Sequence, residues 1–76
     1  MTPARLREIG EALYGPNFYE PLSIDLAVSL RSFQRWCSGA RDIPPIEGEL
    51  AALCHERARE IDRIAAELSS ATADSG

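Results

Sequence analysis

The sequence predicts an all-α fold of about four helices. Apolar residues recur every three or four positions in several stretches, which is the period of an amphipathic helix. Proline, glycine and helix-capping residues separate these stretches, and no stretch shows the alternation of a strand. The helices are expected over residues 3–14, 18–26, 29–38 and 45–68.

The chain has 76 residues, the length of one small domain. We expect this domain to span residues 1–68, including the long last helix, and the polar residues 69–76 to form a disordered tail. A chain this short buries only about 60% of its unfolded surface, so it often needs additional support. A single histidine excludes a zinc cluster. Cys37 and Cys54 fall on apolar helical faces, where we expect both to be buried and reduced. Oligomerisation is then the expected support.

The first expected helix, 3–14, has clear start and stop signals. Thr2 is a suitable N-cap, and Pro3 suits the first helical position. The pair Gly15-Pro16 ends the helix, because proline disfavours a helical conformation in the residue before it. The apolar face carries Leu6, Ile9 and Leu13.

The second expected helix, 18–26, has two possible starts. Asn17 and Glu20 fit a capping box, with the acid three residues after the cap. Alternatively, Pro21 occupies the first helical position of a later start. Phe18 is expected to pack beneath this helix.

The third expected helix, 29–38, has two chemically different faces. Ser29 is a natural N-cap and Gly39 a natural stop. At 100° per residue, one face is apolar and the other polar. The apolar face carries Phe33, Trp36 and Cys37, and the polar face carries Arg31 and Arg35, flanked by Gln34 and Ser38.

The last expected helix, 45–68, carries apolar residues at heptad spacing over about two heptads. The series is Cys54, Ala58, Ile61, Ala65 and Leu68. This stripe either packs wholly against the first helix or pairs with the same helix of a second chain. We expect a homodimer, with Ile61, Ile64, Ala65 and Leu68 at the interface.

The net charge of −4 is unevenly distributed. Residues 1–44 carry five arginines and five acids, whereas residues 45–76 carry three arginines and seven acids. Between Val28 and Arg41 there are three arginines and no acid. The third expected helix therefore lies in a local basic patch, although the chain as a whole is acidic.

The run LSIDLAVSLRSFQRWCSG over residues 22–39, followed by ARDIPP, resembles the helix-turn-helix of Cro/repressor-type (XRE-like) DNA-binding proteins. The family pattern is roughly L-A-x-x-L-G-V-S-x-x-T-V-x-R-W-x-x-G. The matching residues are Leu22, Leu26, Val28, Ser29, Arg35, Trp36 and Gly39. Ser23 stands where a small alanine is usual, which is a mild departure. Phe33 replaces a smaller β-branched residue, which implies a repacked core. Ala27 stands where the family usually has glycine, which costs roughly 1 kcal/mol if the turn requires a positive φ.

The resemblance implies that helix 29–38 enters the major groove of double-stranded DNA. Arginine can then bond guanine, glutamine can pair with adenine, and serine can bond bases or phosphates. The expected DNA-binding residues are Tyr19, Ser29, Leu30, Arg31, Ser32, Gln34, Arg35, Ser38 and Arg41.

Several of these residues have a second interpretation. Leu30 contacts a thymine methyl or lies in the core. Arg41 clamps a phosphate or pairs with Asp42. Tyr19 contacts a phosphate or packs on Phe18. Ser29 acts chiefly as a helix cap.

The expected function is a sequence-specific transcriptional regulator, more specifically a repressor, that binds a palindromic DNA site as a dimer. The alternative is a protein-interaction module, such as an antitoxin or adaptor, whose acidic C-terminal helix holds a basic partner. No catalytic constellation, cofactor, metal or small-molecule site is expected. The sequence shows no signal peptide or membrane span, so a cytoplasmic location is expected.

Overall fold

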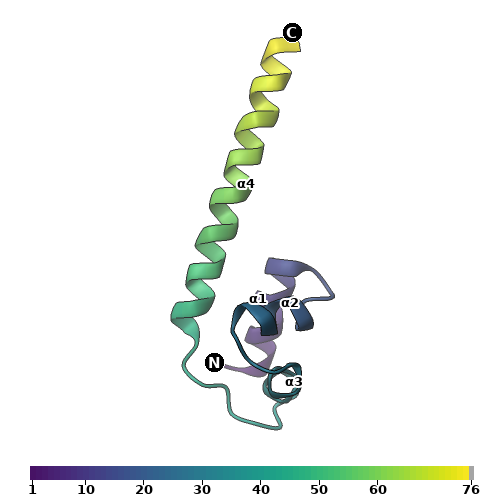
Figure 1. Cartoon of the computed structure of the whole chain (residues 1–76), viewed down its shortest axis with the longest axis vertical. Coiled ribbons are helices and arrows are strands. Elements are labelled where there is room, and N and C mark those ends of the chain that lie inside the picture. Colours follow the sequence, from purple (N-terminus) through teal and green to yellow (C-terminus); the bar gives the residue numbers. More distant parts are fainter. Residues whose placement is uncertain (76) are drawn as a thin grey trace.

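The computed structural model describes residues 1–75, with side chains described as far as Ala71. The chain is all-helical over this range, as predicted from its sequence. Three short helices form a body, and one long helix packs against it and then projects away (Figure 1). The helices are α1 (Pro3–Tyr14), α2 (Tyr19–Asp25), α3 (Leu30–Ser38) and α4 (Glu47–Ser75). The molecule measures 55 × 22 × 19 Å.

The ends of α1 confirm the start and stop signals predicted for it. The start of α2 differs from both predicted starts. Thr2 Oγ1 accepts a hydrogen bond from the Arg5 amide at 3.1 Å. At α2 the expected range 18–26 shortens to Tyr19–Asp25, and Phe18 is an N-cap that makes no side-chain capping bond. Pro21 is then the third helical residue, where an amide has no partner within the helix. The first hydrogen bond within the helix runs from the Leu22 amide to the Phe18 carbonyl. Pro21 therefore removes no hydrogen bond from the helix.

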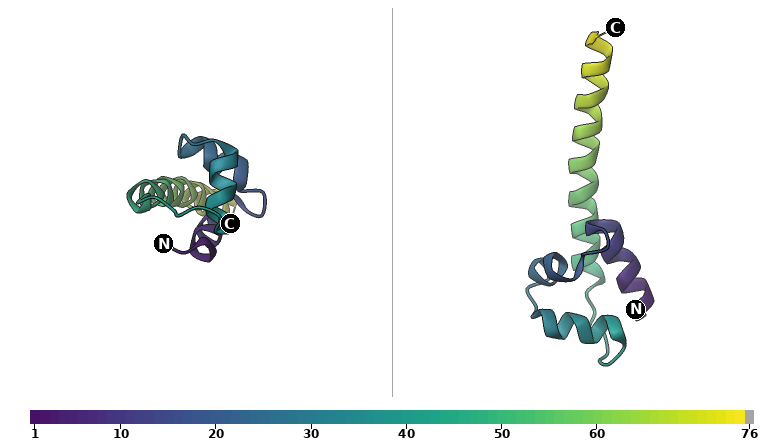
Figure 2. Two further views of the ribbon diagram at one scale, coloured as in Figure 1. Left: turned by 90° about the horizontal axis from the view of Figure 1, so that it is seen from below. Right: turned by 90° about the vertical axis from the view of Figure 1, so that its right-hand side faces the viewer.

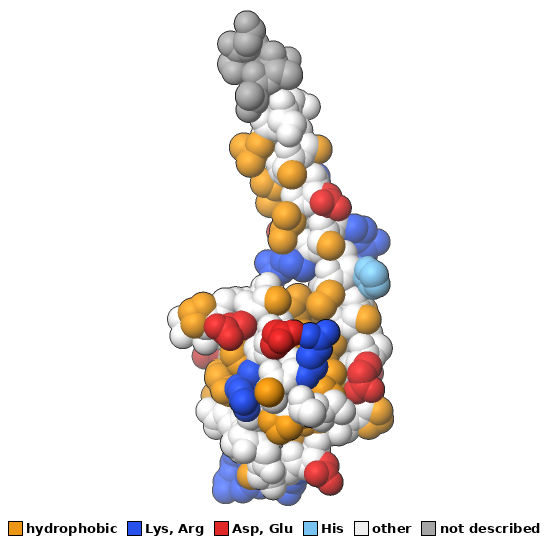
Figure 3. Space-filling view, turned by 180° about the vertical axis from the view of Figure 1, so that it is seen from behind, with side chains coloured by type: hydrophobic (Ala, Val, Ile, Leu, Met, Phe, Trp, Pro, Cys, Tyr) orange, Lys and Arg blue, Asp and Glu red, His pale blue; other side chains and the backbone are white. Residues whose placement is uncertain are grey.

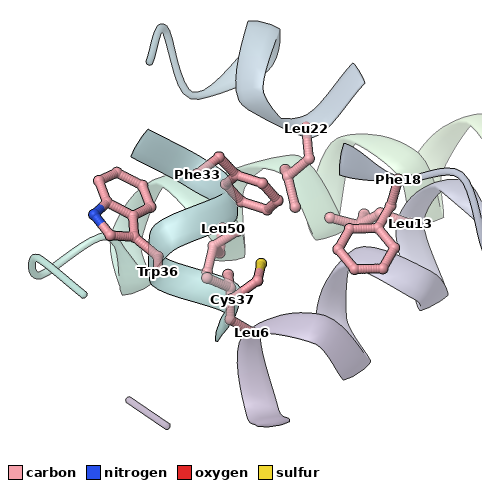
Figure 4. Packing of buried hydrophobic residues seen from close by; sticks show 8 residues of the cluster. All are labelled: Leu6, Leu13, Phe18, Leu22, Phe33, Trp36, Cys37 and Leu50. Atoms are coloured by element: carbon pink, nitrogen blue, oxygen red, sulfur yellow. The ribbon is translucent and has the colours of Figure 1, made fainter. Parts of the chain in front are cut away.

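The core lies between α1, α2, α3 and the start of α4 (Figure 4). Phe33 is fully buried and contacts Phe18 edge to face, with ring centroids 6.2 Å apart. Trp36 contacts the same Phe33 ring at 6.2 Å. The buried apolar residues are Leu6, Leu13, Phe18, Leu22, Phe33, Trp36, Cys37 and Leu50. This set confirms that the apolar face of α3 is buried in the core.

The turn between α2 and α3 explains the strained position expected in the sequence. Ala27 has a φ of 58°, the one positive value among the described non-glycine residues. Its amide donates to the Ile24 carbonyl, and the Val28 amide donates to the Ser23 carbonyl, both at 3.0 Å. These two bonds close the turn and hold Ala27 in a conformation that costs an L-residue roughly 1–2 kcal/mol.

Helix α4 differs most from the prediction. It begins at Glu47 rather than at 45, because the Ile46 carbonyl accepts the first helical bond, from Leu50. It continues past the predicted end at Leu68 to Ser75, so the backbone expected to be disordered is helical up to that residue. The small residues after Leu68 include alanines, which favour helix. Gly76 lies outside the described residues.

As far as the side chains of α4 are described, only those of its first turns touch the body. Leu50 is buried, Leu53 is half-buried, and the Arg57 guanidinium lies 5.0 Å from the centre of the Tyr14 ring. From Ala58 to Ala71 every side chain is exposed. Cys54 is also exposed, which corrects the expectation that both cysteines are buried. The reason is that α1 covers the side of α4 that carries Leu50 and Leu53, and Cys54 lies beside that contact.

Candidate nucleic-acid interface

Helix α3 lies at the end of the molecule opposite the projecting part of α4 (Figure 2). Phe33, Trp36 and Cys37 point into the core, so the opposite face of α3 is directed outward. Positively charged side chains gather at this end of the molecule (Figure 3). The chain has no lysine, so these charges are arginines.

The arginines of α3 and of the loop after it have no partner for their charge. Within the described residues, the guanidinium groups of Arg31, Arg35 and Arg41 form no hydrogen bond, ion pair or ring contact. The other arginines of the body are engaged: Arg5 pairs with Glu8, and Arg7 donates to the Cys37 carbonyl. Within the body, the unpaired arginines therefore lie on α3 and in the loop after it, whereas on α4 the described Arg59 and Arg63 are also unpaired.

The N-terminus of α3 is held by the predicted cap. Ser29 Oγ accepts a hydrogen bond from the Ser32 amide at 3.1 Å and donates one to Ser32 Oγ at 3.0 Å. Ser29 thus acts as the expected cap. Ser32 is half-buried at the side of the helix, and its hydroxyl is already engaged with Ser29.

The C-terminus of α3 is held by several bonds to its last carbonyls. Gly39 takes up the left-handed conformation at φ 84°. The Arg41 amide donates to the Arg35 carbonyl at 3.2 Å, which brings the backbone of Arg41 against the last turn of α3. Ser38 Oγ donates to the same Arg35 carbonyl at 3.2 Å. Arg41 is exposed and forms no ion pair with Asp42 within the described part of the chain.

Sequence reasoning missed the contribution of Arg7. Its guanidinium donates to the carbonyl of Cys37, a carbonyl in the last turn of α3 that has no partner within the helix. This bond joins α1 to α3 and fixes the direction of the exposed face. No local pattern in the sequence predicts it, because the two residues are 30 positions apart.

Tyr19, Leu30 and Gln34 line one groove between the starts of α2 and α3. The groove has a volume of about 400 Å³, and Glu20 contributes an acid to its wall. The Tyr19 ring stacks on Phe18, with centroids 4.4 Å apart, which confirms the packing interpretation of Tyr19. Leu30 is 40% exposed, so it is not a core residue.

The structure therefore brings most of the predicted DNA-binding residues to one end of the molecule. Arg31, Gln34 and Ser38 are exposed along the outward face, and Arg35 is half-buried beside them. Tyr19 and Leu30 border this face through the shared groove.

The residues predicted to form a dimer interface lie on the projecting part of α4, far from α3. We call Ile61, Ile64, Ala65 and Leu68 the exposed stripe. Ile61 is 57% exposed, Ile64 43% and Leu68 64%. The alternative in which this stripe packs wholly against the first helix is wrong, because α1 reaches only the first turns of α4.

One buried thiol in α3 has a perturbed acidity. Burial raises the pKa of Cys37, because an apolar environment disfavours the thiolate, and the nearby Arg7 charge partly opposes this effect. A thiol held protonated in this way is unreactive.

No helix in the described part of the chain combines the length and the apolar character that a membrane span requires. Comparison with protein-family models, with curated proteins and with solved structures found no match to this chain.

Proposed function

We propose that this protein is a sequence-specific regulator that binds double-stranded DNA by inserting the outward face of α3 into the major groove. The observation that carries the proposal is the concentration of unpaired arginines at α3, while Arg5 and Arg7 in the same body are engaged. Unpaired, exposed guanidinium groups attract phosphate, and their fixed fork can bond guanine through two donors. This local charge explains DNA binding by a chain of net charge −4.

The proposed contacts follow the chemistry of each side chain. Arg31 and Gln34 read base edges, and Arg35 is shared between bases and backbone. Leu30 offers an apolar contact to a thymine methyl. The residues assigned to phosphates are Ser38 and Arg41, and Ser29 and Ser32 form the helix start that approaches the DNA backbone. The protein acts as a binding protein rather than an enzyme, and repression by occupying a promoter requires no further surface.

We further propose that the protein acts as a homodimer through the exposed stripe, because one short helix offers few DNA contacts. Fully burying an aliphatic side chain contributes ~1.5–3 kcal/mol, and these side chains are already partly buried. The three large residues of both chains then supply roughly 6 kcal/mol against an association cost of ~4 kcal/mol or more. The isolated dimer is therefore weak.

Binding of the purified protein to duplex DNA, measured by fluorescence anisotropy at increasing salt, tests the proposal. The affinity should fall linearly with the logarithm of salt concentration, because phosphate contacts release counterions. Arg31→Ala and Arg35→Ala should each weaken binding to a selected site at least tenfold and leave the unfolding midpoint unchanged. The matched control is Arg59→Ala, which removes the same charge from an exposed position on α4.

Selection of bound sequences from random duplex DNA supplies that site. No detectable duplex binding at low salt would refute the proposal. If the two α3 variants unfold the protein, these arginines are structural and the assignment of the outward face is wrong.

A second candidate function is the protein-interaction module, and the surroundings of the exposed stripe favour it. A cavity of about 270 Å³ lies where α4 leaves the body. Its wall contains Asp25, Glu56 and Glu60, which would attract a basic partner. Absence of duplex binding, together with a complex that requires Ile61 and Ile64, would select this function instead.

A further inference from the structure

One continuous face of α4 runs from the body to the end of the exposed stripe. At 100° per residue, its members fall within an arc of about 80°. They are Leu50, Leu53, Arg57, Ile61, Ile64, Leu68 and Ala71. The spacing from Arg57 onward is that of a coiled-coil seam. The side of α4 that meets α1 and the side that is exposed further along are therefore the same side, as Figure 3 also shows.

This continuity disfavours a parallel pair. A symmetric parallel coiled coil along the whole seam places each residue of α4 opposite its own copy, so the partner helix would have to lie against residues 50–57. That surface is already covered by α1, with Leu50 buried and Arg57 lying over Tyr14. Two helices pack 8–10 Å apart, which is the space that α1 occupies.

An antiparallel pair fits the same surface. In such a pair Ile61 lies opposite Ala71 of the second chain and Ile64 opposite its Leu68, which alternates the two seam positions. The helix of the second chain then ends at the level of Arg57, just where α1 begins to cover the seam. The positive charge of Arg57 at that level stabilises the C-terminus of the second chain's helix, which is the negative end of its dipole. The Glu67 side chains of the two chains approach each other, and Arg63 lies one turn away on each helix to offset their repulsion.

We infer that two copies pair antiparallel through α4 and so hold two separate stretches of duplex DNA. The inference rests on the proposed function, because it needs α3 to bind DNA. In each chain α3 lies at the end of the molecule opposite the projecting part of α4 (Figure 1). Two molecules 55 Å long that overlap by about 27 Å, which is 18 residues at 1.5 Å each, therefore hold their α3 faces roughly 80 Å apart and directed away from each other. DNA is stiff over ~150 base pairs, so one short duplex cannot reach both faces. The two half-sites therefore lie on different duplexes or far apart on one, rather than in a compact palindrome.

Disulfide trapping tests the direction of pairing in the full chain. In a Cys54→Ala background, Ile61→Cys and Ala71→Cys proteins are oxidised separately and as a mixture. An antiparallel pair should give a disulfide only in the mixture, because two Ile61 positions are then displaced by about 15 Å along the helix axis. Disulfides in the separate samples would show a parallel pair and overturn the inference. No disulfide in any sample would also overturn it.

Co-capture of two duplexes tests the consequence for DNA. One duplex carrying the selected half-site is immobilised. Protein and a second, fluorescent copy of the duplex are added, and the retained fluorescence is measured. The wild type should retain it, Ile61→Asp should lose at least nine-tenths of this retention, and each should still bind a single duplex. Ala66→Asp, on the opposite side of α4, is the matched control and should retain it fully.

The outcomes separate the two proposals. Binding of each duplex without co-capture would overturn the antiparallel bridge and leave the DNA-binding function intact. No binding to either duplex would overturn both.

Discussion

Gly10 is the position where the close packing of the body can be tested most sharply. It lies within α1, and a methyl group placed there would come closer than 3.0 Å to three atoms of the Phe18 ring. That ring cannot easily move, because Tyr19 stacks on one face and Phe33 contacts its edge. Gly10→Ala should therefore force a shift between α1 and the start of α2.

The size of the effect follows from two opposing contributions. Overpacking a core costs ~1–3 kcal/mol. Alanine in place of glycine within a helix returns ~1 kcal/mol. Three ring atoms lie inside 3.0 Å of the added methyl, so the cost should fall in the upper part of that range. The net loss should then be about 1–2 kcal/mol, which lowers the melting temperature of a domain this small by about 5–15 °C.

Urea and thermal unfolding measure this loss through the fluorescence of Trp36, which is buried in the same core. Gly48→Ala is the matched control, because a methyl at Gly48 in α4 meets no atom within 4 Å. It should leave stability unchanged or raise it by up to ~1 kcal/mol. The packing of Phe18 on α1 is refuted if Gly10→Ala is as stable as Gly48→Ala.

Three further outcomes are expected. Ala27→Gly should stabilise the protein by up to ~1 kcal/mol in urea unfolding, because glycine adopts a positive φ without strain. The control Ala40→Gly, at a negative φ, should destabilise it by ~0.4–1 kcal/mol. Equal losses of stability in the two variants would contradict the described turn. Ser29→Ala should lower stability by ~1 kcal/mol through loss of the Ser32 cap bond, and no change would show that water caps α3 equally well. The raised pKa of Cys37 means that the folded state holds the thiol proton more tightly than the unfolded chain, so stability should be constant below the usual thiol pKa and fall as pH rises above it, from about pH 8.5. Cys37→Ala should remove this decline, and an unchanged decline would assign it to another group.

Much of the fold could be predicted from the sequence because its signals are local. Thr2, Ser29 and Gly39 cap helices through bonds to residues at most three positions away. The inward face of α3 follows from the helical period alone, since Phe33 and Trp36 can share a side only in a helix. The strain at Ala27 could also be predicted, because an alanine stands where the turn of the resembled family usually has glycine.

Other features required the tertiary structure, because they depend on which surfaces meet. The bond from Arg7 to the Cys37 carbonyl joins residues far apart in the chain, and no periodicity encodes it. Ile61 lies on the same side of α4 as Leu50, yet only Leu50 is buried, because α1 is too short to cover the rest of α4. Periodicity determined which side of α4 is apolar. The length and position of α1 decided where that side stops being covered and becomes available to a partner.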